Sequence, residues 1–311
     1  MESVNPPALL IEAFATAPGQ GNGAAVVRLE EPLETHRMQA LAASLRQSET
    51  AFLLAVGEHW LLRWFTPACE VDLCGHATLA ALLALGHWGE LRPGAEVVFH
   101  SRSGALPACL DPAAPQRGTI ALPAHNLIPA AAPRALDGLL AERTGASCQR
   151  FWSSSLGYQV ALLPPGTGLE GLEGLGSELV GPLRRGLVVM AAVEGSDPRA
   201  PQALGLQADY QLRFFAPDLG IPEDPVTGSA HALVAPFWLE QTGKAAVLGW
   251  QPSTRAGGMV CRAASSGMIQ LLGSGLLLWD GTLHLGPGTA GEAKLCATGA
   301  WAGWADLLPS G

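Results

Sequence analysis

Two short stretches combine a carboxylate, a glycine and a polar side chain at the start of an apolar run. Residues 72–82 read DLCGHATLAAL, and residues 223–231 read EDPVTGSAH and lead into ALVAPFWL. Each apolar run predicts a buried helix that begins at its glycine, Gly75 or Gly228. The first N–H groups of a helix are unpaired and carry about half a positive charge. We therefore expect two helix starts suited to a small carboxylate, or to an oxyanion that forms during proton transfer.

A proton transfer also needs an acid–base group, and Glu49 is the leading candidate. It stands where a helix-like segment gives way to the apolar strand AFLLAV, with Ser48 beside it. A buried carboxylate is costly without a partner or a function, and burial raises its pKa toward the range useful for acid–base catalysis. An exposed glutamate in a turn is the alternative. His76 and Asp224 are further candidates, although each also fits a plain helix cap or N-terminal anion.

The second helix start has a purely structural interpretation as well. Ser229 and Thr227 can each cap their own helix. A serine-hydrolase interpretation of Ser229 is unfavourable, because VTGSAH lacks the G-x-S-x-G elbow. It is the presence of two related helix starts in one chain that favours a functional site.

Composition excludes several other classes. The 311 residues suffice for one large or two medium domains. With a net charge of −9 and no basic stripe, we expect neither nucleic acid nor an anionic membrane as a partner. Apolar runs fall short of the ~18 residues that span a bilayer, and no secretory signal is visible, so we expect a cytoplasmic protein. The six cysteines include no CxxC pair and the eight histidines are scattered, which predicts reduced thiols and no metal site.

The two halves of the chain carry one motif twice. Aligned on their glycines, CGHATLAALLAL meets TGSAHALVAPFW, and each follows an alternating strand that ends in FTP (65–67) or FAP (215–217). This shared order predicts an internal duplication with pseudo-twofold symmetry. We expect strand-rich domains over residues 1–125 and 126–286, with central helices from about 75 and 228. The tail, 287–311, loses periodicity, and its position is not predicted.

These motifs resemble those of the PhzF-like family, named for phenazine biosynthesis. GN at 21–22, SETAFL at 48–53, FTPACEVDLCGHATLAA at 65–81 and EDPVTGSAH at 223–231 occur in the family's order. The resemblance spans roughly residues 9 to 285. It implies the α+β fold of diaminopimelate epimerase, in which two similar domains each wrap a β-barrel-like sheet around a central helix and the active site lies between them. It also implies a homodimer without a cofactor.

The resemblance assigns roles to individual residues. In the phenazine enzyme a glutamate shuttles a proton during isomerisation of a dihydro-hydroxyanthranilate, and Glu49 matches that glutamate. We assign catalysis to Glu49, His76 and Asp224, and substrate binding to Asn22, Ser48, Gly75, Gly228 and Ser229. The resulting expectation is a cofactor-independent isomerase that acts on a small carboxylate-bearing substrate.

Two alternatives stay open. Epimerases and racemases of this fold use two cysteines, one on each central helix. Cys74 stands near the first position, but the second start, DPVTGS, has none, so a two-thiol inversion is disfavoured. An amino-acid epimerase or racemase that pairs Cys74 with Glu49 or Asp224 is one alternative. A non-catalytic member that binds a metabolite or a protein is the other.

Overall fold

The computed structural model describes residues 5–195, 200–285, 301, 304 and 307–308. Two compact units divide these residues. The first comprises residues 5–13, 23–120 and the described residues from 275 onward, and the second comprises residues 14–22 and 121–274. In the described part of the chain, no helix combines the length and hydropathy that crossing a membrane requires.

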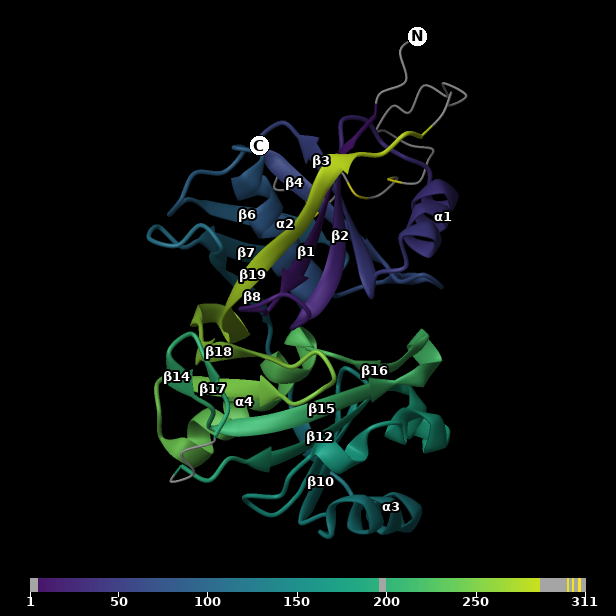
Figure 1. Cartoon of the computed structure of the whole chain (residues 1–311), viewed down its shortest axis with the longest axis vertical. Helices are drawn as coiled ribbons and strands as arrows, with labels where there is room; N and C mark the ends of the chain where they lie inside the picture. Colours follow the sequence, from purple (N-terminus) through teal and green to yellow (C-terminus); the bar gives the residue numbers. More distant parts are fainter. Residues whose placement is uncertain (1–4, 196–199, 286–300, 302–303, 305–306, 309–311) are drawn as a thin grey trace. The chain divides into compact units, whose positions relative to one another are not determined.

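Eight strands pair into a closed ring around the core of the first unit (Figure 1). Following the ring, they are β1 (Pro7–Ala13), β2 (Asn22–Leu29), β3 (Glu49–Val56), β4 (His59–Phe65), β6 (Glu96–Ser101), β7 (Gly104–Leu110), β8 (Arg117–Pro123) and β19 (Met268–Thr282). Strand β19 closes the ring because it pairs with both β8 and β1. The short β5 (Glu70–Val71) extends the ladder beside β4.

Helix α2 (Gly75–His87) lies within this ring, where it packs against β1, β3 and β7. All of its residues from Gly75 to Leu85 are buried, which explains why the segment is apolar on every face rather than along one stripe. The helix starts at the glycine predicted from sequence. By contrast, α1 (Thr35–Leu45) covers the outside of the ring and buries only Met38 and Ala42 (Figure 1).

The second unit repeats the strand order of the first. Strand β11 (Gln159–Leu162) runs parallel to β12 (Leu187–Ala192), which is antiparallel to β15 (Tyr210–Ala216). Strand β15 is in turn parallel to β17 (Val247–Gln251), whose antiparallel partner is β18 (Gly257–Ala263). Strands β2, β3, β4, β6 and β7 show the same succession of parallel and antiparallel steps.

The central helix of the second unit, α4 (Gly228–Thr242), follows β16 (Ile221–Asp224) just as α2 follows β5. It packs against β17 and β18, and it starts at the predicted glycine. The expected α+β architecture of two pseudo-symmetric barrel-like units is thus confirmed. The remaining elements are β9 (Leu127–Pro129), β10 (Arg150–Ser154), β13 (Gln202–Ala203), β14 (Leu206–Gln207), α3 (Arg134–Thr144) and the 3-10 turns η1 (Glu170–Leu172), η2 (Leu175–Glu178), η3 (Gly181–Arg185), η4 (Pro217–Leu219) and η5 (Ser265–Gly267).

A buried arginine–glutamate pair precedes the central helix in both units. Arg63 donates from Nε and Nη2 to the two carboxylate oxygens of Glu70, at 2.7 and 2.8 Å. Arg213 does the same to Glu223, at 2.7 and 2.6 Å. A two-pronged contact of this kind fixes direction as well as distance, so each pair holds the hairpin that delivers the chain to a helix start.

Two tryptophans near the end of the sequence pack on the first unit. The guanidinium of Arg63 lies 4.9 Å from the ring centre of Trp301 and 5.2 Å from that of Trp304. The indole N–H of Trp301 donates to the Leu33 carbonyl at 3.1 Å. Both rings belong to the apolar cluster between α1 and the strands. Residues 286–300 of the tail lie outside the described residues.

Candidate active site

Glu49 is the first residue of β3, and its side chain is buried. The residue is 5% exposed, so the alternative of an exposed glutamate in a turn is wrong. Its Oε2 lies 3.0 Å from Nε2 of His76. This oxygen makes no hydrogen bond to a described residue, although the imidazole nitrogen lies close to it. A carboxylate in this state retains a lone pair that can accept a proton.

Cys74 and His76 stand at the start of α2. Cys74 is the N-cap residue and makes no side-chain capping bond, while His76 is the second residue of the helix. The alternative interpretation of His76 as a helix cap is therefore wrong. The Cys74 Sγ lies 3.5 Å from Nδ1 and 3.9 Å from Nε2 of His76. The imidazole thus contacts both the carboxylate of Glu49 and a thiol.

Asp224 forms the centre of a second group of polar residues, in the second unit. Its Oδ1 accepts from Asn22 Nδ2 at 2.6 Å, and its Oδ2 accepts from Thr227 Oγ1 at 2.5 Å. The Asn22 amide also donates to the Val226 carbonyl at 3.1 Å. Thr227 occupies the N-cap position of α4 but makes no side-chain capping bond, so the alternative interpretation of Thr227 as a cap is wrong. The hydroxyl fixes the carboxylate instead.

Gln251, on β17, completes this second group and was not predicted from sequence. Its Oε1 accepts from the Thr227 backbone N–H at 2.9 Å, and its Nε2 donates to the Asp224 carbonyl. One amide therefore ties the end of β16 to the start of α4. The only signal in the sequence is a polar side chain within an apolar strand, since Gln251 is fully buried.

Behind the start of α4 lies a fully buried polar cluster. His231 Nδ1 is hydrogen-bonded to the Tyr210 hydroxyl at 2.8 Å, and that hydroxyl lies 3.7 Å from Cys261 Sγ. Burial lowers the pKa of His231 to about 3 and raises the pKa of Cys261 to about 12. Both groups are therefore neutral near pH 7. A side chain at Gly249 would collide with His231 and Tyr210, which explains the glycine in this strand.

The predicted site residues thus form two groups. One unit holds Glu49, Gly75 and His76, joined by Cys74, and the other holds Asn22, Asp224, Gly228 and Ser229. Ser48 is half-buried and directly precedes Glu49. In the first group, donor atoms of Glu49, Cys74 and His76 all lie within 4.8 Å of one another. Spacing along the chain did not predict this ligand-like cluster.

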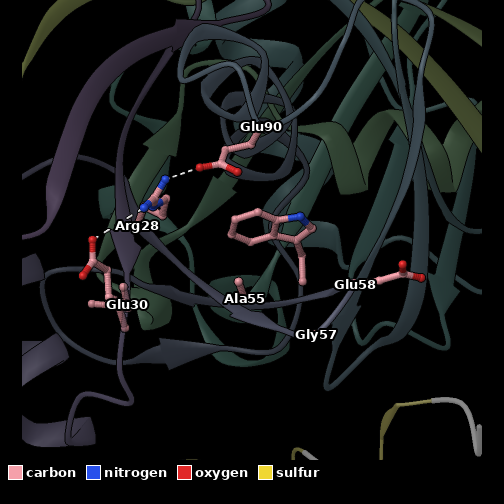
Figure 2. A pocket seen from close by; sticks show the side chains of 8 residues that line it. Arg28, Glu30, Ala55, Gly57, Glu58 and Glu90 are labelled. Carbon is pink, nitrogen blue, oxygen red and sulfur yellow. Dashed lines mark hydrogen bonds and ion pairs between the residues drawn. The ribbon is translucent and has the colours of Figure 1, made fainter.

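A cavity of about 490 Å³ in the first unit contains none of these residues. It is lined by Arg28, Glu30, Glu58, Trp60 and Glu90 among others (Figure 2). Arg28 pairs with Glu90, and it lies 3.6 Å from Glu30. Arg28 neutralises two of its carboxylates and the third, Glu58, is exposed, so this cavity lacks the buried acid–base group that Glu49 provides.

Comparison with known proteins gives consistent results. A family model described as phenazine biosynthesis-like protein matches residues 11–143 and 187–274. The chain is 34% identical over 286 residues to an uncharacterized isomerase of Pseudomonas aeruginosa. The match covers 88% of this chain and 97% of that protein. A crystal structure of a PhzF-family protein from Enterococcus faecalis matches with a TM-score of 0.73 and 28% identity, over 91% of this chain and 100% of that one. A probable proline racemase from Agrobacterium radiobacter, with a TM-score of 0.62 and 12% identity over 96% and 99% of the two chains, shares the fold alone.

Proposed function

Because the chain belongs to the phenazine biosynthesis-like (PhzC-PhzF) family, we propose that it moves a proton within a small carboxylate-bearing substrate by general acid–base catalysis. The protein is an isomerase, in line with its relatives. The proposal adds that the reaction needs no cofactor, since the polar groups of the chain supply both the base and the donors for a developing oxyanion.

The state of the Glu49 carboxylate carries this proposal. It is buried, its Oε2 has no hydrogen bond to the described residues, and His76 Nε2 lies 3.0 Å away. In the proposed reaction, Oε2 accepts a proton from an acidic carbon and returns it to another carbon of the same molecule. His76 orients the carboxylate and relays the proton. Assistance of this kind accelerates reactions by about 10²–10⁴-fold.

The second group of residues would bind the rest of the substrate. We assign the N–H groups at the starts of α2 and α4 to the substrate carboxylate and to the developing oxyanion. Asp224, held by Asn22 and Thr227, has a fixed orientation and suits a positively charged or hydroxyl group of the substrate. We further propose a cytoplasmic homodimer that acts on a free metabolite. Light scattering should then give twice the 32.2 kDa mass of one chain.

The test is Glu49→Gln, with deuterium uptake from heavy water into a panel of small carboxylic acids measured by NMR. Once the wild-type protein labels one acid, the variant should label it at least about 100-fold more slowly, because an amide cannot accept the proton. Glu58→Gln is the matched control, since Glu58 is exposed in the turn that follows the same strand. Circular dichroism checks the fold. Unchanged labelling by a folded Glu49→Gln protein would rule out the mechanism.

Amino-acid epimerisation with Cys74 is a second candidate function. The observation that favours it is the 3.5 Å separation of Cys74 Sγ from His76 Nδ1, because a neighbouring imidazole can take the thiol proton. In this case Cys74→Ser should abolish deuterium exchange at the α-carbon of an amino acid. Exchange that survives Cys74→Ser but not Glu49→Gln would exclude the epimerase. Exchange of any kind would exclude a non-catalytic binding protein.

A further inference from the structure

Three donor atoms of three different kinds converge in the first unit. His76 Nε2 lies 3.0 Å from Glu49 Oε2 and 3.9 Å from Cys74 Sγ, and all three donors lie within 4.8 Å of one another. All three residues are buried. One carboxylate, one imidazole and one thiol in a buried cluster form a set of ligands that protein zinc sites use.

A metal ion bound at His76 Nε2 requires one small and one larger side-chain movement. Zinc bonds of about 2.3 Å to sulfur and about 2.0–2.2 Å to nitrogen and oxygen, in tetrahedral geometry, place neighbouring donors about 3.4–3.6 Å apart. The imidazole and carboxylate must therefore separate by a few tenths of an ångström. The thiol lies nearer to Nδ1 than to Nε2, so the cysteine side chain must turn to another rotamer to reach an ion bound at Nε2.

The backbone around these donors is well fixed. Glu49 opens β3, whose parallel register with β2 sets Glu49 against Ala24. Cys74 and His76 belong to the start of a buried helix, and the Thr78 hydroxyl donates to the Cys74 carbonyl at 2.5 Å. A site built on a strand and a helix holds its geometry better than one built on loops.

We propose that Glu49, Cys74 and His76 bind Zn²⁺ or a similar thiophilic divalent ion, with three protein ligands and an open fourth position. Thiolate and imidazole select such ions over Mg²⁺ and Ca²⁺, which prefer oxygen ligands. Binding converts the Cys74 thiol to a thiolate, and the released proton passes to solvent. Among the described residues, neither Asp224 nor the carboxylates near Arg28 form such a mixed set of donors. Both oxygens of Asp224 accept hydrogen bonds, and the cavity at Arg28 offers only carboxylates.

The ion would act as a reversible inhibitor, and this consequence rests on the proposed function. A Glu49 carboxylate that is bound to a metal ion cannot accept a proton from a substrate. Zinc should therefore stop the deuterium exchange described above, and a chelator should restore it. Zinc binding itself is independent of the proposed function, because it is measured without any substrate.

The experiment uses Co²⁺ as the probe on the full-length, chelator-treated protein. A tetrahedral site with one thiolate gives intense visible bands and a near-ultraviolet sulfur-to-cobalt band. We expect both at one ion per chain, and we expect Zn²⁺ but not Mg²⁺ to remove them. Cys74→Ser should abolish the sulfur band and weaken binding at least about tenfold. Cys69→Ser and Glu58→Gln, which alter an exposed thiol and an exposed carboxylate, should change neither.

A second variant keeps the test decisive if Cys74→Ser misfolds. His76→Gln should retain the sulfur band at high cobalt concentration but bind at least about tenfold more weakly, because only the nitrogen ligand is lost. No sulfur band in the wild-type protein would overturn the proposal. A band that survives Cys74→Ser would also overturn it, because the ion would then be bound elsewhere. Neither result depends on whether Glu49→Gln abolishes proton exchange.

Discussion

His231 gives the second unit a specific sensitivity to acid. Burial in α4 lowers the pKa of this side chain to about 3, whereas the pKa of a histidine in an unfolded chain is about 6.5. Below pH 6.5 the unfolded chain binds a proton that the folded chain excludes. The free energy of unfolding therefore decreases as the pH falls from about 6.5 toward 3, and the full contribution is present only above pH 6.5.

The size of the effect follows from the two pKa values. Each pH unit in this window lowers the free energy of unfolding by about 1.4 kcal/mol, so the loss between pH 7 and pH 4.5 is about 2.5 kcal/mol. The neighbouring groups do not offset it. Burial raises the pKa of Tyr210 and the pKa of Cys261, so both stay neutral throughout the acidic range.

The measurement compares the wild-type protein with His231→Gln. Each protein is unfolded in urea at pH 7 and at pH 4.5. The fraction unfolded is then measured by a short hydrogen-exchange labelling pulse at one fixed pH. Peptides from α4 report on the second unit, and peptides from α2 report on the first. Glutamine does not titrate. The difference in free energy of unfolding between the wild-type protein and the variant, measured in the α4 peptides, should therefore change by about 2.5 kcal/mol between pH 7 and pH 4.5. A difference that is the same at both pH values would refute the reasoning. The α2 peptides serve as the internal control.

Three further substitutions test the parts that position the site. Arg213→Met leaves Glu223 without its two-pronged partner, and breaking such a buried pair should destabilise the second unit by about 3–5 kcal/mol in urea unfolding. Glu223→Gln keeps an acceptor and should cost less, and equal losses would contradict the ion-pair interpretation. Thr227→Val removes the hydroxyl that fixes Asp224, so deuterium exchange should fall by about tenfold or more while the fold is kept. Unchanged exchange in that variant would separate Asp224 from the reaction.

Local sequence signals predicted the elements that carry the site. The glycine before each apolar run marked the starts of α2 and α4, because a helix start and the loss of polar periodicity are both encoded within a few neighbouring residues. The repeated order of FTP or FAP followed by a glycine and a buried helix likewise predicted the internal duplication. Glu49 was identified because a carboxylate at the start of an apolar strand is unusual.

Contacts between distant residues were not predictable in this way. Asn22 meets Asp224 across 202 positions, and Gln251 reaches Thr227 from another strand, so both depend on the register of the sheet rather than on spacing. The Cys74 side chain lies next to His76 because the chain turns into a helix between them, with Cys74 outside it. No pattern along the chain encodes which of several possible partners a side chain will contact.

The closure of the first ring has a consequence for synthesis. Strand β19 lies late in the sequence, yet it fills the gap between β8 and β1, and Trp301 packs on Arg63 later still. On the ribosome, residues 14–22 and 121–274 have all emerged before residues 275–282 can complete that ring. The second unit can therefore finish folding first. Until β19 is synthesised, the first unit has two unpaired strand edges, those of β8 and β1. Nascent-chain chaperones should be needed chiefly to shield those two edges.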